Sequence, residues 1–158
     1  SIGDTITVPG KKFKFGGIPT FAPEHFSRVS PKDSMKRKQF IKGTEQIAQE
    51  GAIQIFKLPN SGMEEVIVGV VGTLQFDVFQ YRMRSEYGVE LRMEGLPYEH
   101  LRFIAKSPVE DLKDLTLSSD VELLEDYRGR SLLVFSSLWS IDYTIKRNPG
   151  LELSETLN

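Results

Sequence analysis

The sequence predicts an α+β protein built on a split βαβ plait, with a further α/β extension at its C-terminal end. Three observations support this fold class. Short runs rich in β-branched residues alternate with segments whose apolar residues recur at helical spacing. The order of the first six segments is strand, helix, strand, strand, helix, strand, and turn residues such as Gly51 and Gly88 separate them. This order is the ferredoxin-like arrangement.

The first half of the chain supplies the plait. Asp33 is placed to cap the first helix, because its carboxylate can accept the free amide hydrogens of the first turn. A Pro-Asn-Ser-Gly turn joins two of the strands as a hairpin. The expected elements are a strand over His25–Val29, a helix between Asp33 and Gly51, strands over Ala52–Leu58 and Val66–Val71, a helix over Leu74–Tyr87 and a strand over Val89–Glu94.

The second half predicts a less regular extension. Its last helix carries two cations at the C-terminal end, where the helix dipole favours them, and stops at Asn148–Gly150. The expected elements are a strand over Tyr98–Ala105, a short helix over Val109–Leu115, strands over Val121–Leu124 and Ser131–Phe135, and a helix over Leu138–Arg147.

The N-terminal residues read as part of a different unit. Ser1–Val8 forms a short strand pattern without a neighbouring partner, and Gly16–Gly17 reads as a linker. We therefore expect residues 1–17 to be the tail of a preceding domain, residues 18–96 to form the plait and residues 97–158 to form the extension.

The helix predicted over Leu74–Tyr87 is apolar on two sides. At about 100° per residue, its apolar residues fall into two stripes that lie nearly opposite one another. The stripes are Leu74, Val78 and Tyr81 on one side, and Phe76, Phe79, Met83 and Tyr87 on the other. Since the plait sheet covers only one side, we expect the extension or a neighbouring domain to cover the other.

Charge is distributed very unevenly, although the net charge is only −2. Cations dominate between residues 28 and 42, and acids dominate between residues 110 and 126. Four cations lie close together on the first predicted helix: Lys36, Arg37, Lys38 and Lys42. This run is either an ordinary solvated helix face or a contact for the phosphate backbone of a nucleic acid.

Several classes of site lack the residues that they need. The chain contains no cysteine, which excludes disulfides and thiolate chemistry and fits a reducing cytosol. Its two histidines, His25 and His100, lie far apart in sequence, so we expect no metal site. No apolar run approaches the roughly 18 residues that span a bilayer, so no membrane partner is expected.

Motifs for nucleotide chemistry and nucleophilic catalysis are also missing. No glycine-rich loop ends in Lys-Ser or Lys-Thr, and Gly69–Gly72 lacks the third glycine of a dinucleotide fingerprint. We therefore expect neither catalytic nor cofactor-binding residues in this chain. The central strand Val66–Val71 carries no aromatic residue, so its face is not expected to read RNA bases. Trp139 and Tyr143, on the last helix, are interpreted as core residues.

Several segments resemble the release factor 3 family of translational GTPases. The similarity extends over Gly17–Glu94 and is most specific at Val66–Val78, which reads Val-Ile-Val-Gly-Val-Val-Gly-Thr-Leu-Gln-Phe-Asp-Val. It is weaker at Ser136–Trp139 and Asn148–Gly150. Elongation factor G has a related run with Glu-Leu-His where this chain has Thr73–Gln75, and that difference favours the termination factor.

The resemblance implies a fold like the third domain of elongation factor G, with residues 1–17 as the tail and linker of a β-barrel second domain. It implies that the chain is a non-enzymatic, cytoplasmic C-terminal fragment that docks on ribosomal RNA and protein of the small subunit. Its other implied partners are its own GTPase and barrel domains, and neither DNA nor a membrane is expected. GTP and magnesium would bind in the GTPase domain, which this fragment lacks. The whole factor would promote the dissociation of class I release factors from the ribosome. Candidate ribosomal RNA contacts are Lys36, Arg37, Lys38 and Lys42.

Two alternatives stay open. The first is the third domain of an elongation factor G-like GTPase. The second is a small plait hydrolase of the acylphosphatase type, which needs an arginine and an asparagine at a phosphate-binding loop. The only asparagine inside the plait, Asn60, lies in the predicted hairpin turn, which argues against this activity.

Overall fold

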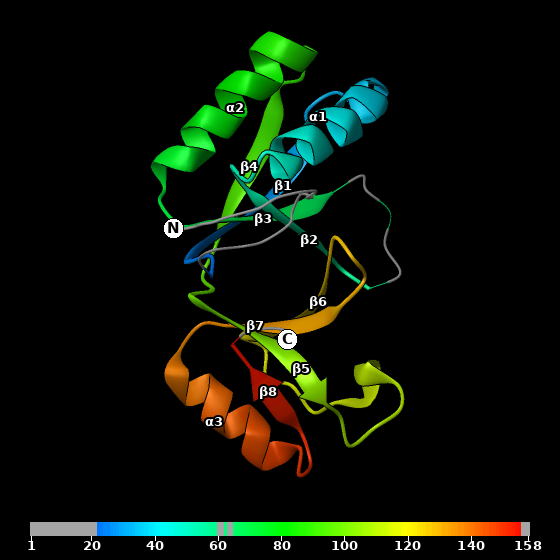
Figure 1. The fold of residues 1–158 in the computed structure, drawn as a ribbon, viewed down its shortest axis with the longest axis vertical. Coiled ribbons are helices and arrows are strands. Elements are labelled where there is room, and N and C mark those ends of the chain that lie inside the picture. The colour runs from blue at the N-terminus through cyan, green and yellow to red at the C-terminus, as the bar shows by residue number, and fades with distance from the viewer. Residues whose placement is uncertain (1–21, 60–61, 63–64, 156–158) are drawn as a thin grey trace, which may run out of the picture.

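The computed structural model describes residues 22–59, 62 and 65–155, and Figure 1 shows the fold. Within these residues, the strands form one sheet in the order β4-β1-β3-β2-β6-β7-β5-β8. The strands are β1 (His25–Pro31), β2 (Gln54–Lys57), β3 (Val66–Val70), β4 (Leu91–Leu96), β5 (His100–Lys106), β6 (Val121–Asp126), β7 (Ser131–Phe135) and β8 (Glu152–Ser154). The helices are α1 (Arg37–Gln49), α2 (Leu74–Tyr87) and α3 (Leu138–Arg147), with short 3-10 turns η1 (Ser34–Lys36) and η2 (Leu112–Asp114).

The strand order β4-β1-β3-β2 confirms the predicted plait. β1 runs antiparallel to both of its neighbours, with Phe26 opposite Gly69 of β3 and Leu96 of β4. β2 and β3 form the predicted hairpin, in which Ile55 pairs with Val68. The predicted N-terminal tail at residues 1–17 and the turn residue Asn60 lie outside the described residues.

Alternation along the plait strands gives the sheet two apolar faces. Along β3, Val66 and Val68 belong to a core beneath α1 and α2, together with Phe40 and Phe79. Ile67, between them, belongs to a different core on the opposite face. The central strand β3 is therefore buried on both sides.

The core on the opposite face joins the plait to the C-terminal strands, and we call it the shared core. Its buried residues are Phe26, Phe56, Ile67, Tyr98, Leu101, Leu124, Leu132 and Val134. The backbone joins the two halves of the sheet over only two residue pairs, Phe56 with Asp126 and Lys57 with Glu125. Figure 1 shows the plait above this junction and β5–β8 with α3 below it. The helix-free face of the plait is thus covered by the extension.

A third core lies beneath α3. Along β7, Leu132 and Val134 belong to the shared core, whereas Leu133 and Phe135 belong to the core that includes Ile141 of α3. The same alternation that buries both faces of β3 therefore buries both faces of β7. The layers follow in the order α1 and α2, plait strands, C-terminal strands, α3 (Figure 1).

The extension departs from the sequence expectation in one helix and contains one strand that was not predicted. The helix predicted over Val109–Leu115 is only the turn η2, where the Asp111 carboxylate accepts from the Lys113 amide at 3.0 Å. The helix does not continue past η2, because Asn148 holds the backbone of Thr116: its Oδ1 accepts from the Thr116 amide at 2.7 Å and its Nδ2 donates to the Thr116 carbonyl at 2.9 Å. β8 was not predicted, because it has three residues and depends on pairing with β5.

The second stripe of α2 was expected to be covered by the extension or by a neighbouring domain, and the structure excludes the extension. Phe79 and Met83 are buried, but Leu74, Val78 and Tyr81 have 71%, 47% and 65% of their surface exposed. The extension lies across the sheet from α2, on the face that carries no helix (Figure 1). The stripe formed by these three exposed residues, which we call the α2 stripe, is left uncovered by the described residues.

Substitution of two adjacent residues distinguishes the two sides of α2. Phe79→Ala should lower the free energy of unfolding by about 3–5 kcal/mol, because it removes a ring from the core. Val78→Ala should change it by about 0.5 kcal/mol or less, because it truncates a half-exposed side chain. Urea denaturation of the two variants measures both values. A Val78→Ala cost as large as that of a core truncation would show that the α2 stripe is covered.

Candidate nucleic-acid interface

The basic run lies at the N-terminal end of α1. Asp33 begins this segment: its Oδ1 accepts a hydrogen bond from the Met35 amide at 2.9 Å, as the predicted cap requires. The cap holds the short turn η1, which leads directly into α1 at Arg37. The local signal for a helix start was therefore correct, although the first turn is 3-10 rather than α-helical.

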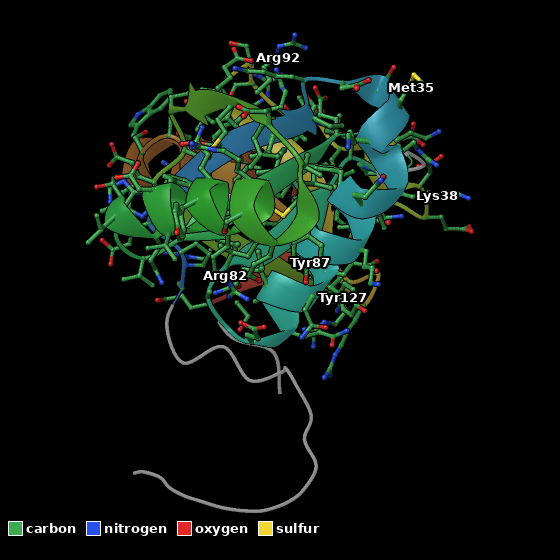
Figure 2. The ribbon with its side chains drawn as sticks, turned by 90° about the horizontal axis from the view of Figure 1, so that it is seen from above. Met35, Lys38, Arg82, Tyr87, Arg92 and Tyr127 are labelled. Atoms are coloured by element: carbon green, nitrogen blue, oxygen red, sulfur yellow. The ribbon has the colours of Figure 1, made fainter. Side chains whose placement is uncertain are left out.

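The structure separates the four candidate cations. Lys36 is half-buried, whereas Arg37, Lys38 and Lys42 are exposed. Lys38 points away from the body of the molecule (Figure 2). Lys38 and Lys42 lie one turn apart beside a shallow groove that also includes Glu45. Within the described residues, neither of these two lysines takes part in an ion pair, so they are the pair best placed to meet an anionic partner.

Close packing against α2 fixes the position of α1. The glycine at position 43 faces α2, and a methyl group there would lie 2.7 Å from both Met83 Sδ and the Tyr87 ring. Tyr87 lies between the two helices (Figure 2). Only glycine permits so close an approach, although glycine lowers helix propensity. The cations of α1 are therefore presented on a rigid element.

An ion-pair network joins the C-terminal end of α1 to α2. Arg82 donates to Glu50 at 2.6 Å through Nη1 and to Glu86 at 2.9 Å through Nε. These hydrogen bonds hold the pKa of Glu50 and the pKa of Glu86 below their usual value. Glu50 and Glu86 are therefore both paired with Arg82 near the C-terminal end of α1, whereas Lys38 lies near its N-terminal end.

The last helix exposes a group of residues that the sequence interpretation placed in the core. That interpretation is wrong for Trp139, which has 67% of its surface exposed. The Tyr143 ring stacks on the Trp139 indole at a centroid distance of 4.9 Å and an interplanar angle of 14°. The Arg147 guanidinium lies 5.6 Å from the Tyr143 ring centre, and Arg147 Nη1 donates to the Tyr143 hydroxyl at 2.7 Å. We call these three residues, spaced one turn apart, the α3 ladder.

The buried side of α3 explains the error. It consists of Ser140, Ile141 and Thr144, and two of these three residues are polar. The Thr144 hydroxyl donates to the Ser140 carbonyl at 2.7 Å, so its polar atom is satisfied inside the helix. Hydropathy therefore assigned the large aromatic residues to the core. The signal that could have found the ladder is the spacing Trp139, Tyr143, Arg147, because it places a cation on the same side as both rings.

Asp120 fixes the N-terminal end of α3. Its carboxylate accepts hydrogen bonds from the hydroxyls of Ser118 at 2.6 Å, Ser136 at 2.7 Å and Ser140 at 2.9 Å. The Ser137 side chain caps the helix by accepting from the Ser140 amide at 3.2 Å. The hydrogen bonds from Ser118, Ser136 and Ser140 lower the pKa of Asp120 to about 2. One ionised carboxylate thus ties the start of β6 to the end of β7 and to the first turn of α3.

A groove of about 1080 Å³ lies between the N-terminal ends of α2 and α3, and Thr73 and Leu138 line its two sides. His25 and His100, which are far apart in sequence, also line it. The described part of the chain begins there, at Ala22. No group of three or more histidine, aspartate or glutamate residues among the described positions is arranged to hold a metal ion. No helix in this part of the chain is long and apolar enough to cross a membrane.

Comparison with known proteins identifies the family. Residues 15–145 match the family model described as class II release factor RF3, C-terminal domain. The chain belongs to this family. The match confirms the predicted release factor 3 membership and favours it over the elongation factor G-like and acylphosphatase alternatives.

Relatives of this release factor domain carry the name peptide chain release factor 3. The chain is 45% identical to the protein of Symbiobacterium thermophilum over 150 residues, which are 95% of this chain and 28% of the relative. It is 42% identical to the protein of Listeria welshimeri over 99% of its own length and 29% of the relative's. The protein of Gloeobacter violaceus is 39% identical over 98% of the chain and 29% of its own length. The chain therefore spans somewhat more than a quarter of these relatives.

In this release factor 3 domain, the glutamine that distinguished the sequence from elongation factor G fixes a turn. Gln75 Oε1 accepts from the amides of Val71 and Gly72, both at 3.0 Å. Its Nε2 donates to the Ala52 carbonyl at 3.2 Å. The side chain thus closes the turn between β3 and α2 and ties it to the chain that enters β2.

The hydrogen bonds of Asp120 make a prediction about acid stability. Because its pKa is lower in the folded chain (about 2) than its ordinary value of 3.8, the stability it contributes is present above about pH 4 and is lost as the pH falls towards 2. Asp120→Asn should lower the free energy of unfolding by about 1–3 kcal/mol at neutral pH. The difference from wild type should shrink between pH 4 and pH 2 in urea titrations.

Asp142→Asn is the matched control, because Asp142 is an exposed acid on the outer side of the same helix. It should leave the stability nearly unchanged at neutral pH. A difference between wild type and Asp120→Asn that is constant from pH 7 to pH 2 would show that ionisation of Asp120 does not stabilise the fold.

Proposed function

We propose that this domain is a non-catalytic docking module that binds the bacterial ribosome. The factor that contains it then promotes the dissociation of class I release factors once the finished peptide is freed. GTP and magnesium are assigned to another domain of that factor. The observation that carries the proposal is membership of the release factor 3 family. It is combined with two lysines on the tightly packed helix α1 that form no ion pair with any residue the structure describes.

The physical basis of docking is phosphate binding by Lys38 and Lys42. Cations held close to RNA phosphates release condensed counterions, and this release favours association at low salt. Gly43 lets α1 pack tightly against α2, so the backbone that carries the two lysines is already fixed before binding. Binding therefore costs little additional backbone entropy. The proposed partner is RNA of the small ribosomal subunit, together with the protein beside it.

The α2 stripe supports a second partner, the GTPase or barrel domain of the same factor. Leu74 lies beside Thr73, which lines the same groove as Ala22, where the described chain begins. A domain that precedes Ala22 in the factor can therefore reach the α2 stripe. Burying Leu74, Val78 and Tyr81 against that domain removes exposed apolar surface from water.

Ribosome binding at different salt concentrations tests the proposal. Co-sedimentation of the 158-residue chain with small subunits should give an affinity that falls as salt rises. Lys38→Gln with Lys42→Gln should weaken binding and reduce the slope of log affinity against log salt by slightly less than one unit for each phosphate that is no longer neutralised. The charge-matched control is Lys106→Gln with Lys113→Gln, two exposed lysines of the extension.

Three results are informative. Weakened binding by the α1 variant alone, with unchanged circular dichroism, supports the lysine pair as the contact. Equal weakening by both double variants would mean that net charge, and no particular surface, drives binding. Wild-type chain that fails to sediment with ribosomes at any salt concentration would contradict the docking function.

A further inference from the structure

The α3 ladder is a preassembled stack with one open aromatic face. Tyr143 covers one face of the Trp139 indole at a centroid distance of 4.9 Å. Because α3 begins at Leu138, no residue one turn earlier in the helix covers the other face. Two-thirds of the Trp139 surface is accordingly exposed (67%). Exposing an ordered tryptophan costs hydrophobic free energy unless something binds there.

Cations accompany the rings on the same side of the helix. At about 100° per residue, Lys146, Trp139, Tyr143 and Arg147 occupy an arc of about 100° on the surface of α3. Arg147 already interacts with the Tyr143 ring and hydroxyl, so its guanidinium is held beside the stack. The acid of α3, Asp142, lies at the edge of this arc. Two flat rings with two cations fit a ligand that combines a flat base with phosphates.

We propose that the α3 ladder binds unpaired RNA, with a nucleobase stacked on the open face of Trp139 and the neighbouring phosphates beside Lys146 and Arg147. This inference rests on the proposed ribosome-docking function and adds a second RNA contact to it. A single-stranded segment is required, because the bases of a duplex are stacked on one another and present no face to the indole. Stacking is tolerant of base identity, so the contact positions the domain without reading a sequence.

The ladder is separate from the lysine pair. Figure 1 places α1 and α3 at opposite ends of the molecule, with both layers of strands between them. Substitutions at the two surfaces should therefore act independently on ribosome affinity, as distant sites generally do. Their spacing is fixed because the shared core joins the two halves.

Trp139 is the only tryptophan of the chain, so its fluorescence reports this site directly. We expect short single-stranded oligoadenylate to quench the emission saturably at low salt, and a fully paired RNA duplex of equal length to quench it much less. Lys146→Gln with Arg147→Gln should weaken the quenching. Absence of saturable quenching, or equal quenching by the duplex, would overturn the proposal.

Ribosome co-sedimentation supplies the second arm. Trp139→Ala should lower the affinity about 5- to 150-fold, the usual range for removal of one stacked base, and Trp139→Phe should restore much of it. Leu138→Ala, an exposed apolar neighbour outside the ladder, is the control and should have little effect. If Trp139→Ala weakens ribosome binding but RNA does not quench the tryptophan, the partner is a ribosomal protein and the RNA assignment is wrong.

The two proposals fail in different ways. Suppose that ribosome binding depends on Lys38 and Lys42 but is unchanged by Trp139→Ala. The proposed contact at the α3 ladder would then be wrong, and the docking function would stand. If the chain does not bind ribosomes at all, both the docking function and the second RNA contact at the α3 ladder are contradicted.

Discussion

The structure depends on burial of the helix-free face of the plait. Phe26 and Phe56, whose ring centroids are 6.1 Å apart, pack there against Leu124 and Leu132 of the extension. The backbone contributes little to this junction, since β2 and β6 pair over two positions only. Apolar burial, at roughly 25 cal/mol per Å², is therefore the main force that joins the halves. Gly69 serves the same packing, because a methyl group there would lie 2.9 Å from Pro23.

In the proposed function, the shared core would make the domain a spacer that sets the distance between its two RNA contacts. α1 packs on one side of the paired layers and α3 on the other (Figure 1), so the lysine pair and the α3 ladder are held at a fixed separation. Two weak contacts on one rigid body bind more tightly together than either alone, provided that the target presents both at the matching distance. Neither contact needs catalytic groups. The domain would thus contribute position and orientation to the factor that carries it.

Local signals explain what the sequence predicted well. α2 was predicted to the residue, because Gly88 adopts the left-handed C-cap conformation (φ 68°) that ends a helix. Non-local packing explains the errors. Periodicity showed two apolar stripes on α2 but not that the extension lies across the sheet from it. The orientation of α3 is set by hydrogen bonds from Ser140 and Ser136 to Asp120, sixteen to twenty residues away, so hydropathy misplaced Trp139. Charge is visible in sequence, so the lysine pair could be named there as a candidate contact, whereas the ladder required knowledge of which side of α3 is buried.

Cooperativity of unfolding tests the role of the shared core most directly. The fluorescence of Trp139, the only tryptophan of the chain, reports the extension, and far-ultraviolet circular dichroism reports mainly α1 and α2, the two longer helices. In urea, we predict that both signals follow one transition with the same midpoint, and that Leu124→Ala in the shared core moves both to lower urea together. Two separate transitions in the wild-type chain, or a Leu124→Ala variant that shifts only one signal, would contradict this role of the shared core.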